Sequence, residues 1–555
     1  MHAVASMAGR PARALRGGGP AAPRPPCPSS AARHEARPPP SPESEEDVTR
    51  RRSLPPLLWL AALLAGCAGG PPTDPAEVAP PPPVQWFAPL PHDGRVAGLT
   101  QWWGRFDDPL LPELQAAAQA ASPTIASAAS RIEQARANQV AARGTLLPTL
   151  DGVATASRAR QDLSLPITNT AAAQVQAGWE IDVFGGNRAA WEAARARYAG
   201  AEAGWHEARV SVAAELAGTY LALRACEAQL EKVQADATSR AETSRLTELA
   251  ARAGFQAPAA SALARASAAQ GNSLYLQVKA QCDGQVKSLV ALTALDEPTL
   301  RARLADRRGR LPAPGPFAVG AVPGEVLNQR PDLYIAARDV EAASAEVSQA
   351  RAARLPRVTL GGQFGRSRVE AGPLEAEGTT WAVGPLTVSL PLFDAGRRRA
   401  SVDAARARYD EATALYRARV REAVREVEQA LVTLDSTEAR REDALTAAEG
   451  FDASYKAVEA KYRGGLGSLF ELEDARRSAL QAQISVVDLE RDRVNAWIAL
   501  YRALGGGWTP DAAGAGTAPA SMPAPPPAST PPSPPPPPSP SPPAPPPAAP
   551  RPPPW

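Results

Sequence analysis

The hexapeptide Ala-Ala-Arg-Ala-Arg-Tyr occurs twice in this chain of 555 residues, at 193–198 and again at 404–409. The same offset aligns Arg-Ala-Gly-Phe at 252–255 with Arg-Gly-Gly-Leu at 463–466. Chance does not keep one register across both a helical motif and a glycine-containing turn, and self-similarity at a fixed offset indicates a repeated structural unit. The chain therefore contains a duplication.

We predict two homologous halves, residues 99–297 and 323–508, joined by a linker rich in proline and glycine at 298–322. In each half the residue pattern predicts a helix of about 35 residues, two strands, a very long helix, a glycine-containing turn and a long returning helix. The expected fold is mainly α-helical, with a duplicated unit made of strands and a long helical hairpin.

The strand signal is clearest just before each very long helix, and earlier strands are predicted at 149–158 and 358–364. The alternating apolar residues are Val175, Ala177, Trp179, Ile181 and Val183 in the first half, and Leu386, Val388, Leu390 and Leu392 in the second. Runs of about nine to eleven residues suit tilted strands that cross a bilayer. The aromatic residues expected at the membrane interfaces are Trp179, Phe184, Trp381 and Phe393. The alternative is a soluble antiparallel sheet packed on a helix.

The predicted helices are too long for an ordinary globular domain. The pattern from Arg188 to Ala253 corresponds to about 100 Å of helix if it is unbroken. Two sets of residues recur every seven positions: Trp191, Tyr198, Trp205, Val212 and Thr219, and a second seam of Leu216, Leu223 and Leu230. A sustained heptad predicts helices that pack side by side as in coiled coils.

The stretch before the first half has the layout of an export signal. A basic patch and a short apolar run lead to Leu-Ala-Gly-Cys at 64–67, and this order is typical of a secretory signal. We interpret 48–66 as a lipoprotein signal peptide and Cys67 as the acylated first residue of the mature chain. The alternative is a buried helix with an incidental cysteine. Residues 1–47 precede the signal, so we predict that translation starts at Val48.

Proline is concentrated at both ends of the chain, which contains 60 prolines in total. This composition predicts a Pro-rich tether at 67–98, a disordered tail at 509–555 and disorder in 1–47. Lys and Arg together number 60 against 58 Asp and Glu, and this near balance argues against nucleic-acid binding.

The number of strands predicts an oligomer. Lipid offers no hydrogen-bond partners to the backbone N–H and C=O groups at an open sheet edge, so membrane strands must close into a barrel. The four strands of one chain are too few, because the smallest membrane barrels have about eight. Two copies would give a barrel that side chains fill, whereas three copies leave a lumen. We therefore expect a homotrimer whose long helices continue the barrel as a second tube.

Two motifs resemble signatures of the outer membrane factor family, the TolC-like channels, and most closely its NodT-type lipoproteins. They are Trp-Trp-Gly-Arg-Phe-Asp-Asp-Pro-Leu at 102–110 and Asn-Gln-Arg-Pro-Asp-Leu at 328–333, the second followed by Ala-Arg-Ala-Ala-Arg-Leu-Pro at 350–356. The resemblance covers about 60–508. It implies a trimeric 12-stranded β-barrel continuous with a periplasmic α-helical barrel.

The resemblance also implies a function. Such a protein is the exit duct, in the outer membrane, of a tripartite multidrug efflux system. It passes small molecules to the exterior from a periplasmic adaptor and an inner-membrane pump of the RND type. An exit duct for type I protein secretion is the alternative within the same architecture. A lipid-tethered periplasmic coiled-coil scaffold is the alternative from another class.

The glycine-containing turns correspond to the periplasmic tips of the family. The resemblance implies that Glu471 and Asp474, three residues apart on one helix face, line a pore constriction. The family usually has Asp at the first of these positions, and the equivalent first-half residues are Ala260 and Leu263. The alternative is an ordinary acidic helix start. The residues implied to contact the adaptor are Gly254, Phe255, Gly465, Leu466, Gly467 and Ser468.

Cys226 and Cys282 lie at similar distances before and after the turn near Phe255. On antiparallel helices they would be at the same height, and an oxidising periplasm permits a disulfide between them. Two buried thiols are the alternative.

No feature of the sequence indicates catalysis. We find no nucleophile–base set, phosphate-binding loop or metal-ligand spacing, and the four His are scattered. We therefore expect a conduit that is not an enzyme and needs neither cofactor nor metal.

Overall fold

The computed structural model describes residues 74–81, 83, 85–88, 99–160, 162, 166–315 and 323–510. All of them belong to the unit Gly69–Trp555. The predicted signal peptide at 48–66, Cys67, residues 1–47 and the tail beyond 510 lie outside the described residues, and the tether at 67–98 is described only in part.

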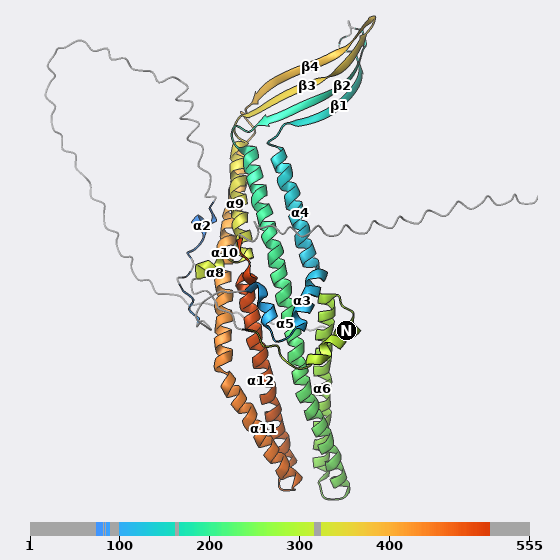
Figure 1. Ribbon diagram of the computed structural model, residues 1–555, viewed down its shortest axis with the longest axis vertical. Coiled ribbons are helices and arrows are strands. Elements are labelled where there is room, and N and C mark those ends of the chain that lie inside the picture. The colour runs from blue at the N-terminus through green and yellow to red at the C-terminus, as the bar shows by residue number, and fades with distance from the viewer. Residues whose placement is uncertain are drawn as a thin grey trace, which may run out of the picture. The chain divides into compact units, whose positions relative to one another are not determined.

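Four strands form one antiparallel sheet in the order β1-β2-β3-β4 (Figure 1). They are β1 Thr149–Ala159, β2 Thr168–Ile181, β3 Arg357–Ala371 and β4 Leu374–Ser389. Each half supplies two strands, as the sequence predicts. The halves are joined inside the sheet, because β2 of the first half pairs with β3 of the second along its full length.

One face of this sheet is apolar and exposed. Two rows across β2, β3 and β4 show this: Val175, Phe364 and Trp381, and Trp179, Leu360 and Leu386. Of these, Val175, Trp179, Phe364, Trp381 and Leu386 are between 38% and 72% exposed. On the same strands, Gln174, Gln176 and Gln363 point to the other face, because side chains alternate along a strand. An apolar face of this extent is typical of a surface that meets lipid or another protein.

β4 begins much earlier than the predicted run at 386–392, and it ends at Ser389. A register shift between Leu360 and Gly362 explains why the alternation of apolar residues does not reveal the first part of β4. On one side of the shift Leu360 pairs with an even-numbered residue of β4, Leu386. On the other side Gly362 pairs with an odd-numbered residue, Val383. A bulge of this kind inverts the alternation, so a strict period of two cannot follow the whole strand.

The expected interface aromatics do not all lie at strand ends. Trp179 is near the end of β2, and Phe184 and Phe393 follow β2 and β4. Trp381, however, is in the middle of β4 because that strand is longer than predicted. Trp381 still lies at the boundary of the apolar face, because the residue pairs of β3 and β4 that lie beyond it on this face carry charged side chains in place of apolar ones. These include the ion pairs Arg366–Glu377 (3.0 Å) and Arg368–Glu375 (2.6 Å).

The first half supplies one uninterrupted long helix. The helices of the first half are η1 Leu99–Arg105, α3 Leu110–Ala121, α4 Pro123–Gly144, α5 Gly186–Arg252 and α6 Pro258–Thr293. Two short helices, α7 Glu297–Leu304 and η2 Ala305–Arg307, lie almost entirely in the segment predicted as the linker. α5 runs for 67 residues, as predicted. The expected helix of about 35 residues is divided into α3 and α4. Ser122 caps α4 by accepting from the N–H of Ile125 at 3.3 Å, and Pro123 occupies its first turn, where proline is tolerated.

The second half differs in two helices. Its elements are α8 Pro323–Leu327, α9 Pro331–Ala352, α10 Arg397–Ala439, α11 Arg441–Arg463, α12 Leu469–Ala503 and η3 Gly505–Gly507. α9 has 22 residues instead of the expected 35 or so, because it begins only at Pro331. The very long helix is interrupted at Arg440, which separates α10 from α11. The short α2 Pro75–Val78 packs against α9.

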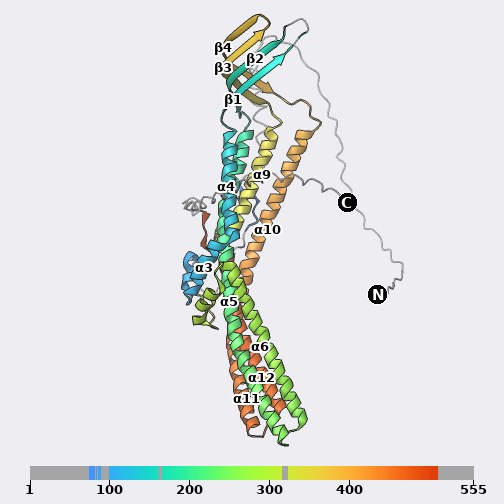
Figure 2. The same cartoon turned by 90° about the vertical axis from the view of Figure 1, so that its right-hand side faces the viewer.

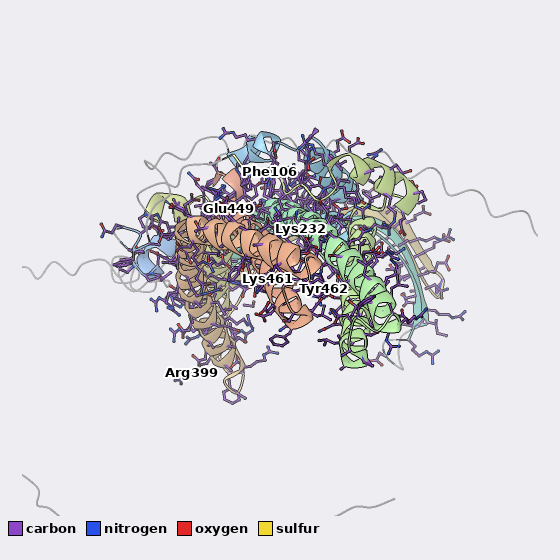
Figure 3. The ribbon with its side chains drawn as sticks, turned by 90° about the horizontal axis from the view of Figure 1, so that it is seen from below. Phe106, Lys232, Arg399, Glu449, Lys461 and Tyr462 are labelled. Carbon is purple, nitrogen blue, oxygen red and sulfur yellow. A yellow bond between two sulfur atoms is a disulfide. The ribbon has the colours of Figure 1, made fainter. Side chains whose placement is uncertain are left out.

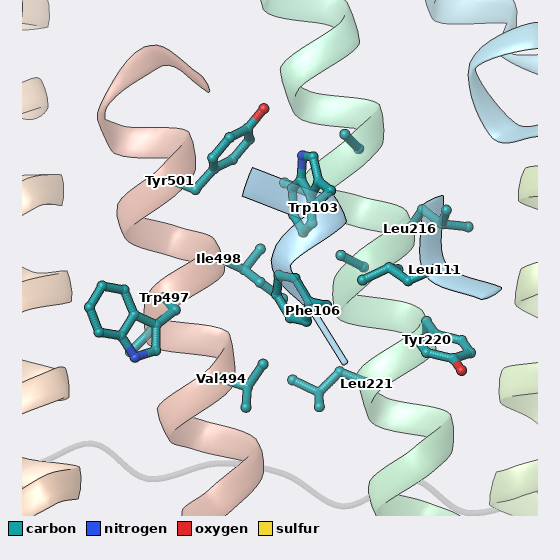
Figure 4. Close-up of a cluster of buried hydrophobic side chains, with 14 of the residues drawn as sticks. Trp103, Phe106, Leu111, Leu216, Tyr220, Leu221, Val494, Trp497, Ile498 and Tyr501 are labelled. Atoms are coloured by element: carbon teal, nitrogen blue, oxygen red, sulfur yellow. The ribbon is translucent and has the colours of Figure 1, made fainter. Parts of the chain in front are cut away.

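The main hydrophobic core lies where the two halves meet. Trp102 is fully buried and its ring stacks on that of Tyr501 at 5.1 Å. Figure 4 shows Trp103 and Phe106 inserted between α12 and α5. The predicted seam of Leu216, Leu223 and Leu230 is buried in the same core. The aromatic residues of the motif at 102–110 therefore pack between helices of the two halves and connect them.

Among the residues that the structure describes, no helix is both long and apolar enough to span a membrane.

Candidate functional site

The two helical turns share one hydrogen-bonding pattern at the end of the molecule opposite the sheet (Figure 1; Figure 2). In the first turn the N–H of Phe255 donates to the carbonyl of Ala250 at 2.8 Å, and that of Gly254 donates to Ala251 at 3.1 Å. Gly254 adopts a φ of 79°. This is a Schellman motif, in which a glycine in the left-handed region ends the helix.

The second turn repeats the motif. The N–H of Leu466 donates to the carbonyl of Lys461 at 3.0 Å, and that of Gly465, with a φ of 73°, donates to Tyr462 at 2.9 Å. A Cβ atom at Gly467 would come within 3.3 Å of both Lys461 Cγ and the backbone nitrogen of Tyr462. Figure 3 views the molecule from below and labels Lys461 and Tyr462.

Both turns expose an apolar side chain at the same position of the motif. Phe255 is 83% exposed and Leu466 is 79% exposed. In a Schellman motif the residue at this position frequently packs back on its own helix. Each tip therefore carries one exposed apolar side chain, and Phe470 is a further exposed apolar residue at the second tip.

The start of α12 contains the predicted acidic pair. Glu471 and Asp474 are both exposed. Glu471 belongs to a capping box: its N–H donates to Ser468 Oγ at 3.1 Å, and its carboxylate accepts from the N–H of Ser468 at 3.4 Å and from Lys461 at 3.4 Å. Its local role is thus the acidic helix start that the sequence left open. The exposed Asp474, one turn later, has no such role in the cap.

The first hairpin carries no equivalent acids. α6 begins at Pro258, and its N-cap Ala257 makes no side-chain cap. Leu263, which corresponds to Asp474, is 46% exposed. The acidic pair is therefore present at the start of α12 and has no counterpart at the start of α6, where Ala260 and Leu263 stand at the equivalent positions.

Sequence reasoning missed a group of buried charges next to the acidic pair. We call it the buried ion cluster, and its members are Asp236 and Arg240 of α5, Ser267 of α6, and Glu473 and Arg476 of α12. Each is at most 9% exposed. The available signal was two opposite-charge pairs at helical spacing, which usually indicate a solvated helix face.

The cluster connects both hairpins through one carboxylate. Glu473 accepts from Arg240 at 2.7 Å, from Ser267 Oγ at 2.6 Å and from Arg476 at 2.6 Å. Arg240 also donates to Asp236 at 2.7 Å. Its two acids and two guanidiniums cancel in charge, which is the condition under which buried charges are tolerated.

Two tyrosines of α11 add contacts to α5. The hydroxyl groups of Tyr462 and Thr247 are 3.1 Å apart, and those of Tyr455 and Ser239 are 3.4 Å apart. The guanidinium of Arg476 lies over the ring of Tyr455 at 5.7 Å.

A disulfide joins Cys226 of α5 to Cys282 of α6, with an S–S distance of 2.08 Å and a Cα–Cα distance of 5.5 Å. Of the two alternatives left by the sequence, the structure thus contains the bridge. It connects the two helices of the first hairpin well above the tip.

The motif at 102–110 ends in a buried polar anchor. Asp108 accepts from the hydroxyl group of Tyr220 at 2.6 Å, and Arg224 donates to the same hydroxyl at 3.0 Å. Burial, followed by the hydrogen bond to Asp108, raises the pKa of Tyr220 above its ordinary range. Tyr220 therefore stays protonated and acts as a donor.

The motif at 328–333 contains a second anchor. Arg330 donates to Asp332 at 2.8 and 2.9 Å, to Glu426 of α10 at 2.7 Å and to the carbonyl of Ala503 at 2.8 Å. The side chain is buried and ties the start of α9 to α10 and to the end of α12. Both signature motifs thus hold helices of different segments together.

Residues that could hold a metal ion do not gather anywhere within the described parts of the chain.

Residues 114–295 and 322–506 match the family model described as "Outer membrane efflux protein". The pyoverdine export outer membrane protein OpmQ of Pseudomonas putida is 31% identical over 77% of this chain and 92% of its own length. The outer membrane protein OprJ of Pseudomonas aeruginosa is 31% identical over 68% of this chain and 80% of its own.

Solved structures agree with this. The outer-membrane channel OprN has a TM-score of 0.70 and 27% identity, covering 80% of this chain and 100% of that one. The open state of the Neisseria gonorrhoeae channel MtrE has a TM-score of 0.66 and 25% identity, covering 80% and 99%. Since the family model spans both repeated halves and relatives match most of the length, this chain belongs to the outer membrane efflux protein family, the TolC-like outer membrane factors.

Proposed function

We propose that three copies of this protein form the exit duct of a tripartite efflux pump in the outer membrane. The duct passes small molecules to the exterior from a periplasmic adaptor and an inner-membrane pump of the RND type. The observation that carries this proposal is the sheet, which exposes an apolar face and ends in two unpaired edge strands.

The edges require partners. Within the described residues β1 pairs only with β2, and β4 pairs only with β3. In lipid, unpaired backbone groups are too costly, so β4 of one copy must pair with β1 of the next until the sheet closes. Three copies of four strands give a barrel of twelve, wide enough for a lumen, whereas about eight strands leave an interior that side chains fill.

The helices support the same assembly. α11, which is described throughout, has no buried side chain. Tyr455, Val458 and Tyr462 pack, partly buried, against the start of α12. The rest of this helix of 23 residues, including the half-exposed Phe451, offers a surface that α6 of a neighbouring copy would cover in a ring of hairpins. The heptad recurrence of apolar residues suits such side-by-side packing.

In this trimer the acidic pair narrows the pore. Glu471 and Asp474 of three copies bring six carboxylates to one axis, and a ring of carboxylates favours cations over anions. The exposed apolar side chains of Phe255 and Leu466 on the tips are suited to a hydrophobic contact with the adaptor.

The nature of the cargo follows from the relatives. Their names refer to export of pyoverdine and efflux of toluene, which are small molecules. We therefore favour small-molecule efflux over type I protein secretion. Restored resistance of an efflux-deficient strain supports this, while restored secretion of a protein without any change in resistance contradicts it.

Conductance in planar bilayers tests the duct directly. The purified protein is expected to conduct ions and to show threefold symmetry by electron microscopy. The substitutions Glu471→Gln and Asp474→Asn together should raise conductance and lower the preference for cations. A monomer without conductance would support the tethered coiled-coil scaffold instead.

Acylation of Cys67, which lies outside the described residues, stays a prediction. Labelling of the cells with palmitate should mark the wild-type protein and not the Cys67→Ala variant.

A further inference from the structure

We propose that the buried ion cluster is the positioning device of the constriction: it fixes the rotation of α12 about its own axis and so aims Glu471 and Asp474 at the pore. This inference rests on the proposed function. It assigns a role to Asp236, Arg240 and Glu473, which are buried away from the pore.

The arrangement of residues on α12 carries the first step. Successive residues are about 100° apart around an α-helix. Glu471 and Asp474 therefore share one face, and Glu473 and Arg476 share another that points roughly 160° away. Whatever fixes the direction of Glu473 and Arg476 thereby fixes the direction of the acidic pair.

The contacts of the cluster are directional, which is the second step. Glu473 uses one carboxylate oxygen for Arg240 and Ser267 and the other for Arg476. Arg476 reaches in addition Ser239 at 3.1 Å and Thr243 at 3.3 Å on α5. Apolar side chains can slide and rotate with little loss, whereas a buried hydrogen-bonded ion network permits one arrangement.

The first hairpin is shaped to receive the cluster. Gly271 of α6 faces Arg240, and a Cβ atom at this position would come within 2.7 Å of Arg240 Cδ. The absence of a side chain at Gly271 gives the Arg240 side chain its path between α5 and α6 toward Glu473. The first hairpin thus forms the fixed side of the contact, and α12 is the side that is positioned.

The duplication supplies the third step. At the repeat offset, Glu473 corresponds to Ala262, and Arg240 corresponds to Phe451, which is 47% exposed. The second hairpin therefore offers no such cluster to α6. The acids and the carboxylate that orients them, Glu473, occur together on α12, and the first hairpin has no counterpart of either.

The test uses full-length trimer and an engineered cysteine, Asp474→Cys. In the otherwise unchanged protein, this cysteine should form disulfides between copies, because three copies converge on one axis. Addition of Glu473→Gln or Arg240→Met should abolish the cross-link and, in the protein that retains Asp474, reduce cation selectivity. The matched control is Glu242→Gln, which breaks the exposed Glu242–Arg245 pair on α5 and should change neither readout.

A second variant separates positioning from folding. Glu473→Asp keeps a carboxylate for Arg240 and Arg476 and should retain part of the cross-link that Glu473→Gln abolishes, whereas a purely structural defect at this position would affect both variants alike. If trimers with Glu473→Gln keep both the cross-link and the cation selectivity, the inference is wrong.

Failure of the constriction itself would look different. In that case Asp474→Cys does not cross-link between copies even with the cluster intact, and neutral replacements at Glu471 and Asp474 leave selectivity unchanged. That result would overturn the proposed constriction and this inference with it, while threefold symmetry and conductance would still support the duct.

Discussion

In the first hairpin α5 runs for 67 residues and is bridged to α6 by the Cys226–Cys282 disulfide, whereas in the second the corresponding helix is interrupted at Arg440. Both hairpins end in the same Schellman turn. The two halves thus share the backbone geometry of the tip, but different interactions stabilise each hairpin. A covalent bridge fixes the first, and buried charges attach the second to it.

The largest expected effect comes from breaking the attachment of the second hairpin. Arg476→Ala removes one of the two guanidiniums that balance the buried Glu473 and Asp236, which should lower the free energy of unfolding by about 3–5 kcal/mol. Limited proteolysis of the trimer should then cut α11 and α12 first. Arg245→Ala, at an exposed ion pair, should cost no more than about 1 kcal/mol, and equal losses in both variants would contradict the distinction.

Removal of the bridge tests the first hairpin. Cys226→Ser with Cys282→Ser should lower the free energy of unfolding by about 2–4 kcal/mol, since a disulfide restricts the unfolded chain. Proteolysis should shift to α5 and α6. Conductance and cation selectivity should stay unchanged, because the buried ion cluster and the packing of α5 against α6 remain, and a change in either would show that the bridge also helps to position the acidic pair.

The shared turn should respond equally in both hairpins. Gly254→Ala and Gly465→Ala each force a residue with a Cβ atom into the left-handed region, at a cost of about 1–2 kcal/mol. A Cβ atom added at either glycine would meet no neighbouring atom within 4 Å, so the cost is purely conformational. Gly464→Ala is the control, because Gly464 has a φ of −79° and should tolerate the change. Thermal unfolding measures all three.

The smallest effect concerns pH. Burial, followed by the charge of Arg209, lowers the pKa of His206 on α5. The unfolded chain therefore binds a proton before the folded protein does, and stability is lost as pH falls from the ordinary histidine range through the lowered pKa. His206→Asn should reduce the loss of thermal stability over that interval. The corresponding residue of α10 is Arg417, and an equal pH effect of Arg417→Gln would contradict the assignment to His206.

The sequence predicts much of this arrangement because the relevant signals are local or repeated. Heptad spacing located α5, and the alternation at 175–183 located β2. The positions of Cys226 and Cys282 about one turn allowed their pairing to be predicted.

Other features escape prediction for physical reasons. The bulge opposite Gly361 inverts the strand period of β4, so its first part shows no continuous alternation. The interruption at Arg440 has neither proline nor glycine to mark it. The buried ion cluster resembles an exposed face until packing brings α5, α6 and α12 together, because its charges are spaced like those of solvated helices.

The pairing of β2 with β3 has a consequence for biogenesis. Thr168 pairs with Ala371, so the sheet joins segments that leave the ribosome far apart in time. Pairing at such long sequence separation is slow, and unpaired strands are prone to aggregate. The strands β1 and β2 therefore have to be kept from aggregating during transport, which calls for a chaperone that shields them until the second half has been translocated.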